Sequence, residues 1–168
     1  GSCGKAVILA GSLRYSGAPL LSAAAALRTG CGYTCLALPE ELFYACIGKY
    51  PEAILTRAPS ENGNLRFDEP FLRSLSVGAD CMAVGMGCGV SRGVYDILCF
   101  LLHEYKGVLL VDADGINSLA AFGVQALEKA SCKVILTPHP KEFSRLSDVE
   151  LPDVLQNGAA LAAGFAGK

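Results

Sequence analysis

The chain is dominated by short apolar runs, each followed within two residues by a glycine, a proline or an aspartate. Five of these runs stand out, at residues 6–10, 33–38, 81–84, 108–111 and 133–136. Runs of this length without polar alternation are typical of parallel strands buried on both faces. Because helical stretches separate them, we expect an α/β fold, a three-layer α/β/α arrangement around a mostly parallel sheet. Residues 1–168 are expected to form one domain.

The segments between these runs predict mostly short helices. Helices are expected at 40–47, 68–76, 91–103, 117–122, 124–129 and 153–165. Asp68 and Ser91 are suited to cap the second and third of them. Residues 49–67 are polar and irregular, so we expect a loop there with one short strand near 53–56.

Composition excludes several classes of protein. Hydrophobic residues make up 52% of the chain and the mean hydropathy is +0.40, yet no apolar run is long enough to cross a bilayer. The first residues lack the layout of a signal peptide, which predicts a cytoplasmic location. The net charge is −2 and the charges are scattered, so neither nucleic acid nor a membrane is expected as a partner.

Eight cysteines and two histidines are the candidate metal ligands. No Cys-x-x-Cys pair occurs, and Cys35, Cys81, Cys99 and Cys132 fall inside segments predicted to be buried. Free thiols packed as small apolar groups are therefore favoured over disulfides, and no metal site is predicted from these residues.

The stretch Gly11–Gly30 joins the first two strands through a turn and an alanine-rich helix. Ser16 is a candidate N-cap and Pro19 suits the first helical turn. Residues 20–27 have hardly a polar atom, which predicts a helix buried nearly all round. Its N-terminus would offer unpaired N–H groups to a polar or anionic ligand. The pattern fits an ordinary strand–helix unit equally well, and it lacks the Lys-Ser/Thr pair of a nucleotide P-loop.

Two further strand ends carry polar or glycine-rich residues. The turn Gly85–Gly89 lacks the third glycine of a dinucleotide fingerprint, because position 90 is Val90, but it would let a flat or phosphorylated ligand approach the backbone. Asp112 and Asp114 follow the 108–111 strand. They could hold a cation, order a water or bind a hydroxyl; alternatively Asp114 caps the next helix and Asp112 accepts backbone N–H groups.

His139 stands between two prolines directly after the last strand. A stiff backbone makes its imidazole a good hydrogen-bonding or stacking group for a ligand. Glu142 either faces the same region or pairs with Arg145 three residues later, and His103 is expected to be a helix C-terminal residue. Since parallel strands end at one edge of the sheet, these residues predict one polar, glycine-lined cleft for a nucleotide-like ligand.

Four segments together resemble the ADP/ATP-dependent NAD(P)H-hydrate dehydratases of the ribokinase-like superfamily. They are GSLRYSGAPLLSAAAALRTGCGYTCLALPE, VGMGCG, LLVDADGINSL and LTPHPKEFSRL, in this order. The resemblance covers essentially the whole chain and implies a ribokinase-like fold. It implies a hydro-lyase that repairs nicotinamide coenzymes: the (6S) hydrates of NADH and NADPH, called NADHX and NADPHX, are dehydrated after ADP or ATP, with Mg²⁺, phosphorylates the ring hydroxyl.

The resemblance also assigns residues. Ala18, the glycines of the 85–89 turn and the segment from His139 to Arg145 match positions that contact the hydrated coenzyme, although Met86 replaces the usual proline. With the strand-end residues added, the predicted substrate-binding residues are Ser12, Gly17, Ala18, Gly85, Gly87, Gly89, Asp112, His139, Pro140, Lys141, Glu142, Phe143, Ser144 and Arg145.

One departure concerns the nucleotide side of the site. The family's Lys-Gly-x-x-Thr segment and the Gly-Ser-Gly-Asp motif with the catalytic Asp are expected beyond Lys168, so no catalytic residue is assigned here and residues 1–168 alone are expected to be inactive, with an unfinished sheet edge. A homo-oligomer is expected. Two alternatives stay open: a ribokinase-like kinase of a thiazole-alcohol type of vitamin precursor, and a non-catalytic module that binds nicotinamide dinucleotides.

Overall fold

Six parallel strands form the centre of the computed structural model, which describes residues 3–167. Their order in the sheet is β3-β2-β1-β6-β7-β8, and all five neighbouring pairs are parallel. The strands are β1 (Lys5–Leu9), β2 (Tyr33–Pro39), β3 (Ile54–Ala58), β6 (Cys81–Val84), β7 (Val108–Val111) and β8 (Lys133–Leu136). The chain reverses its direction of winding between β1 and β6, the place where open α/β sheets bind ligands.

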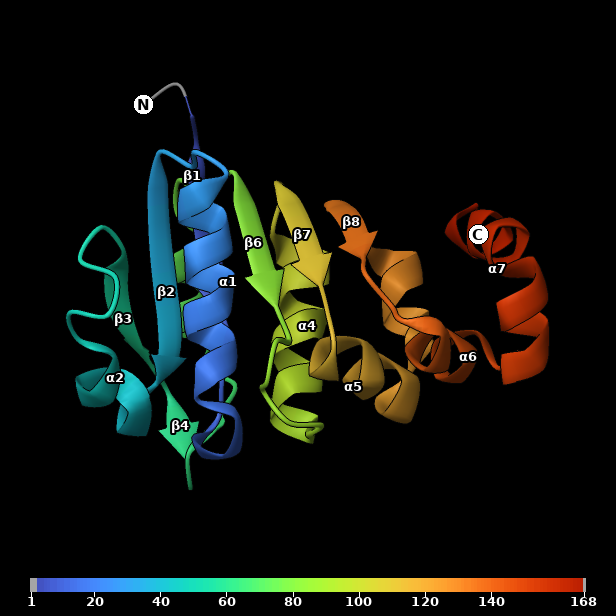
Figure 1. The fold of residues 1–168 in the computed structure, drawn as a ribbon, viewed down its shortest axis with the longest axis horizontal. Helices are drawn as coiled ribbons and strands as arrows, with labels where there is room; N and C mark the ends of the chain where they lie inside the picture. Colours follow the sequence, from blue (N-terminus) through green and yellow to red (C-terminus); the bar gives the residue numbers. More distant parts are fainter. Residues whose placement is uncertain (1–2, 168) are drawn as a thin grey trace.

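Helices cover both faces of this sheet, as the alternation of strands and helices predicts (Figure 1). On one face lie α1 (Gly17–Arg28) and α2 (Glu40–Cys46). On the other lie α3 (Glu69–Ser76), α4 (Arg92–Glu104) and the 3₁₀ helix η2 (Val124–Lys129). Near the carboxyl end of β7 is α5 (Asp114–Phe122), and beyond β8 stand α6 (Pro140–Ser147) and α7 (Leu151–Ala166). The three-layer α/β/α architecture is confirmed.

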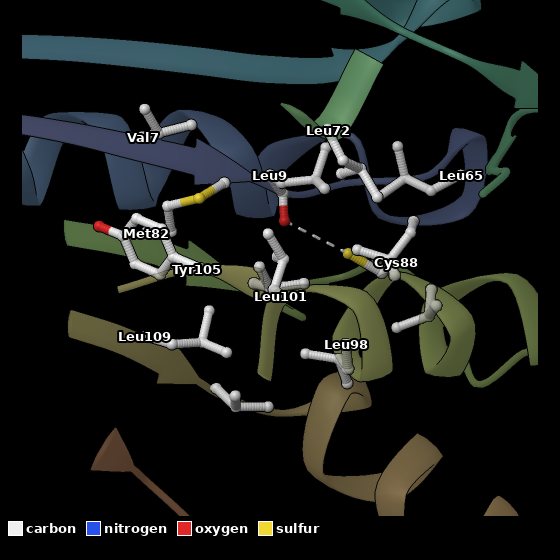
Figure 2. Close-up of a cluster of buried hydrophobic side chains, with 14 of the residues drawn as sticks. Val7, Leu9, Leu65, Leu72, Met82, Cys88, Leu98, Leu101, Tyr105 and Leu109 are labelled. Carbon is white, nitrogen blue, oxygen red and sulfur yellow. Dashed lines mark hydrogen bonds between the residues drawn. The ribbon is translucent and has the colours of Figure 1, made fainter. Parts of the chain in front are cut away.

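The larger apolar cluster lies between the sheet and α4, and Figure 2 shows part of it. Val7, Met82 and Leu109 are neighbours in adjacent strands, and none of them is exposed. Leu98 and Leu101 of α4 pack over them. Burying each such side chain stabilises the fold by about 1.5–3 kcal/mol, so this layer carries much of the stability of the described chain.

The opposite face of the sheet is covered less evenly than the sequence predicts. Ile8, Ala83, Leu110 and Ile135 occupy one register row across β1, β6, β7 and β8. Ile8 is buried under the α1 layer, whereas Ile135 is 48% exposed. The expectation of strands buried on both faces therefore holds for β1 and is wrong for β8, because α1 covers only the strands near the N-terminus of the chain.

Two details of α1 also correct the sequence analysis. Leu21 is 72% exposed, so the helix buries one face through Pro19, Ala23 and Ala24 and is not enclosed all round. An alanine-rich helix looks uniformly apolar in sequence, yet this one packs on the sheet with one side and leaves the other side exposed to solvent. The side chain of Ser16 makes no cap hydrogen bond, while Pro19 does lie in the first turn as predicted.

The predicted caps of α3 and α4 are confirmed, since Asp68 accepts from the Phe71 N–H and Ser91 from the Val94 N–H. The predicted loop 49–67 contains a short hairpin that the sequence analysis missed, made of β4 (Ser60–Glu61) and β5 (Asn64–Leu65). Within residues 3–167, no helix is both long and apolar enough to span a bilayer.

Candidate functional site

The carboxyl ends of β1, β6, β7 and β8 form a rim that brings together the turns singled out in the sequence. Gly11 follows β1 and its N–H donates to the carbonyl of Met86 in the next turn, at 2.9 Å. Gly11 and Gly85 both have positive φ, of 90° and 120°. The turns after β1 and β6 are thus joined through their backbones, in conformations that favour glycine.

The Gly85–Gly89 turn packs directly on the N-terminus of α1. A Cβ added at Gly87 would lie 2.7 Å from the Cβ of Ala18 and 2.9 Å from that of Tyr15, so only glycine fits there. Gly87 and Gly89 also have positive φ. The structure therefore places Ala18 and Gly87, two predicted substrate-binding residues, against each other.

Cys88 lies inside the same turn and is completely buried. Burial raises the pKa of its thiol to about 12. The protonated sulfur lies 3.7 Å from the Leu9 carbonyl, to which it donates (Figure 2). This cysteine is therefore a structural residue of the turn and not a nucleophile.

Asp112 and Asp114 have separate roles at the tip of β7. Asp112 Oδ1 accepts from the Thr137 hydroxyl at 2.6 Å, and Asp114 Oδ2 accepts from the Gly89 N–H at 2.8 Å. Asp112 thus connects β7 to the residues after β8, and Asp114 holds the glycine turn. The residue that occupies the N-cap position of α5 is Ala113, so the expectation that Asp114 caps this helix is wrong.

Ala113 has an unusual backbone, with φ of 49° and ψ of −114°. Only glycine adopts this region readily, and a side chain there costs about 1–3 kcal/mol. Its carbonyl accepts from the N–H of Asn117 and from the side-chain amide of the same residue, at 3.0 and 3.1 Å. The strain lies at the centre of the rim, where strained residues often mark functional sites.

Asn117 and Thr137 are rim residues that the sequence analysis missed. Besides holding Ala113, Asn117 accepts through Oδ1 from the Arg145 guanidinium at 2.9 Å. Arg145 is therefore paired with Asn117 and not with Glu142, which rules out the predicted Glu142–Arg145 pair. Arg145 lies 28 residues after Asn117 on another helix, so the sequence offered no signal for this bond, and none for Thr137.

His139 forms the N-cap of α6 in a capping box. Its Nδ1 accepts from the Lys141 and Glu142 N–H groups at 3.2 and 3.3 Å, while Glu142 Oε2 accepts from the His139 N–H at 3.0 Å. Since Nδ1 is an acceptor, the proton of the neutral ring is on Nε2, 3.3 Å from Glu142 Oε1. Nδ1 is engaged by the cap, and the side chain is 57% exposed. The imidazole is thus fixed with its ring accessible, which suits stacking or hydrogen bonding to a ligand.

The other predicted residues of α6 differ in exposure. Pro140, Lys141 and Arg145 are exposed, whereas Phe143 is buried and packs edge-on against the Phe165 ring of α7, with the centroids 5.8 Å apart. The Ser144 hydroxyl donates to the Val149 carbonyl at 2.7 Å. At the other end of the rim Ser12 is buried and Gly17 is exposed. Ligand contact by these residues remains a prediction.

The rim is an elongated row of contacts: Ala18 to Gly87, Gly89 to Asp114, and Asp112 to Thr137. From β1 to β8 it crosses three strand spacings, about 14 Å, which matches an extended dinucleotide better than a small molecule. A separate groove of about 460 Å³ lies over α3 and α4, between Phe67, Arg73 and His103, and shares no residue with the rim.

Asp112 and Asp114 are engaged by different partners, and binding of a cation by either carboxylate stays a prediction. In residues 3–167 no three His, Cys, Asp or Glu side chains are grouped so that they could hold a metal ion.

The rim geometry and the four sequence segments agree with the comparison to known families. Residues 6–166 match the model of the family described as NAD(P)H-hydrate dehydratase. The chain belongs to this family. Two curated relatives are bifunctional NAD(P)H-hydrate repair enzymes called Nnr: that of Dictyoglomus turgidum is 32% identical over 98% of this chain, and that of Gloeobacter violaceus is 38% identical over 98%.

This chain spans about a third of the length of these relatives, 32% and 31% respectively. Among solved structures, the ADP/ATP-dependent NAD(P)H-hydrate dehydratase of Bacillus subtilis, co-crystallised with ATP/Mg²⁺ and soaked with CoA, is 26% identical with a TM-score of 0.74. That match covers 98% of this chain and 56% of the other. A ribokinase-like superfamily protein of Enterococcus faecalis has a TM-score of 0.76 at 24% identity over 96% of this chain and 54% of its own, which confirms the ribokinase-like fold alone.

Proposed function

We propose that this chain carries the substrate-binding part of an ADP- or ATP-dependent NAD(P)H-hydrate dehydratase, which returns (6S)-NADHX and NADPHX to NADH and NADPH. Family membership supports the reaction class. The observation that carries the assignment to this rim is the packing of Gly87 against Ala18, where no Cβ fits between the two turns. This packing brings two positions that the resemblance assigns to the hydrated coenzyme next to each other, as a shared binding surface requires.

The rim offers such a ligand fixed groups along its length. The N-terminus of α1 stands at one end with the Gly87 turn packed beside it, and the His139 ring, held by its cap bonds, stands at the other end. Each group is held by hydrogen bonds within the chain, so little conformational entropy is lost when a ligand binds. We infer that the chain binds and orients the hydrated coenzyme.

The nucleotide would supply the phosphoryl group that makes the ring hydroxyl a leaving group. No residue of this chain is assigned to ADP, ATP or Mg²⁺, and residues 3–167 contain no group of three His, Cys, Asp or Glu side chains that could hold a metal ion. We therefore derive no step through either group from these residues.

The test is a titration of the 168-residue chain with (6S)-NADHX, followed by calorimetry, with NADH as the comparison ligand. We expect the chain to bind NADHX saturably. We also expect that a polypeptide containing this sequence together with the nucleotide segment restores the absorbance of NADH at 340 nm when ADP or ATP and Mg²⁺ are added. Phosphorylation of a thiazole alcohol without NADHX turnover would favour a vitamin-precursor kinase. Binding without turnover in that longer polypeptide would favour a non-catalytic dinucleotide module.

Three further proposals accompany this function: a cytoplasmic location, assembly into a homo-oligomer, and one structural domain formed by residues 1–168. The location is supported by the substrates, since a repair enzyme acts where its coenzymes are used. The single domain is supported by the family match, which runs unbroken from residue 6 to 166. Analytical ultracentrifugation tests the oligomer.

A further inference from the structure

Two exposed residues next to the Gly87 turn have no assigned role. Arg14 and Tyr15 belong to η1 (Leu13–Tyr15), the 3₁₀ turn between β1 and α1. Tyr15 is 46% exposed, and its Cβ and carbonyl oxygen would lie 2.9 and 3.1 Å from a Cβ added at Gly87. The base of the tyrosine side chain is therefore fixed against the predicted substrate site while much of the residue remains accessible to solvent.

The turn that carries these residues is held from two sides. Within it, the Tyr15 N–H donates to the Ser12 carbonyl at 3.0 Å. From outside, the Leu13 N–H donates to the Gly63 carbonyl at 3.0 Å, and the Leu13 side chain lies against Gly63 at the tip of the β4–β5 hairpin. The backbone of Arg14 and Tyr15 is thus held in place before any ligand binds. Binding a ligand then costs little conformational entropy, which favours a binding role for these residues.

Arg14 differs in its ion pairing from the other arginines that stack on aromatic rings. Its guanidinium lies over the Tyr15 ring, 5.4 Å from the centroid. Among residues 3–167, three other arginines stack on aromatic rings, and each also pairs with a carboxylate: Arg57 with Glu40, Arg73 with Glu69 and Glu104, and Arg92 with Asp96. Arg14 forms no ion pair in this part of the chain, so its charge is available to an anion.

We propose that Arg14 and Tyr15 form a binding contact for the nicotinamide dinucleotide, which rests on the function proposed above. The guanidinium pairs with a phosphate oxygen of the coenzyme, and the uncovered face of the Tyr15 ring stacks on one of its heterocycles. A dinucleotide presents both groups, negative phosphates beside flat rings, and arginine binds phosphate strongly through its fork of N–H donors. The pair would anchor the ligand without taking part in the chemistry.

Four variants test this contact in the 168-residue chain, with (6S)-NADHX as the ligand and calorimetry as the readout. Arg14→Ala is expected to weaken binding about 10- to 100-fold, through loss of a charge-assisted contact. Tyr15→Ala should weaken it about tenfold, and Tyr15→Phe should retain the wild-type affinity because stacking needs only the ring. Arg28→Ala is the matched control: it removes an exposed arginine from the last turn of α1, at the end of the helix opposite the rim, and should leave affinity unchanged.

Salt and stability measurements separate binding from a structural role. Affinity of the wild type should fall as salt rises, and more steeply than that of Arg14→Ala, because screening weakens the phosphate contact. Thermal unfolding of the variants should match the wild type. If the wild type binds no NADHX, the proposed function fails and this contact with it. If the wild type binds, but Arg14→Ala and Tyr15→Ala bind within twofold of it, the contact alone is refuted.

Discussion

At the tips of β6 and β7, backbone atoms of two turns lie against each other, whereas the ends of the rim are held by side-chain hydrogen bonds between partly exposed residues. In the middle, a Cβ added at Gly85 would collide with the Asp112 carbonyl and lie 2.6 Å from the Gly115 nitrogen. At one end the His139 ring caps α6. Beyond the other end, Glu41 holds the β4–β5 hairpin, whose tip contacts the turn after β1 through the Leu13–Gly63 hydrogen bond. Substitutions that add a side-chain atom in the middle of the rim are therefore not tolerated, whereas the side chains at its ends can be replaced without unfolding the sheet.

The largest effect is expected from Gly85→Ala. The added methyl group meets backbone and the residue sits at φ of 120°, so both overlap and strain act together. We expect the free energy of unfolding to fall by about 3 kcal/mol or more, measured by urea denaturation. Gly164→Ala in α7 is the control: nothing lies near its added Cβ, and it should stabilise the chain by about 0.5–1 kcal/mol. A Gly85→Ala protein within 1 kcal/mol of wild type would show that the turns can separate.

His139 allows the binding role of the outer end to be separated from its structural role. Asparagine is a good N-cap, so His139→Asn should keep the free energy of unfolding within about 0.5 kcal/mol while losing the ring, and NADHX should bind about tenfold more weakly. His139→Ala should also lose about 1 kcal/mol of stability with the cap. His103→Ala, an exposed histidine of α4, should change neither. Wild-type affinity in His139→Asn would remove the imidazole from the site.

The same contrast explains which parts of the molecule could be predicted from sequence. The strands were visible because short apolar runs end at glycine, aspartate or proline, and the caps Asp68 and Ser91 follow from local chemistry. The capping box at His139 was not visible, since serine or threonine is the usual first residue. Asn62-Gly63 signals a hairpin turn, but strands of two residues on either side are too short to show a pattern.

The prediction that polar residues gather at one edge of the sheet was correct, but it did not give their arrangement along that edge. Parallel strands had to bring Ala18, Gly87, Asp112 and His139 to one rim, but only the structure shows that they form a row and not a ring. No sequence rule predicts positive φ at Ala113, because alanine itself disfavours this conformation. The strain at the tip of β7 is therefore information that exists only in the fold.

Ala113→Gly tests whether that strain is stored in the middle of the rim. Glycine adopts φ of 49° and ψ of −114° at little cost, so relief of strain should exceed the extra entropy of the unfolded chain. We expect a gain of about 1 kcal/mol in the free energy of unfolding. In the exposed helix α7, Ala160→Gly should lose about 1 kcal/mol instead. Equal losses in both variants would mean that Ala113 is not strained.

The smallest effect is expected at Glu41, an exposed residue of α2 that accepts hydrogen bonds from the β4–β5 hairpin. The Ser60 hydroxyl, 2.6 Å from Oε2, does most to lower the pKa of this carboxyl below its usual value of 4.5, and the N–H groups of Glu41 and Gly63 add to it. A pKa that is lower in the folded state stabilises the protein above pH 4.5, and this stabilisation is lost as the pH falls through the folded pKa. Glu41→Gln should therefore lower stability at pH 7 by about 0.5 kcal/mol or less, since the group is screened by solvent, and leave it unchanged at pH 3.

Glu61→Gln is the control. It removes a carboxylate of the same hairpin that makes no hydrogen bond or ion pair in residues 3–167, and it should show no such difference between the two pH values. If the loss in Glu41→Gln were as large at pH 3 as at pH 7, the hairpin would be held by the shape of this side chain and not by its charge.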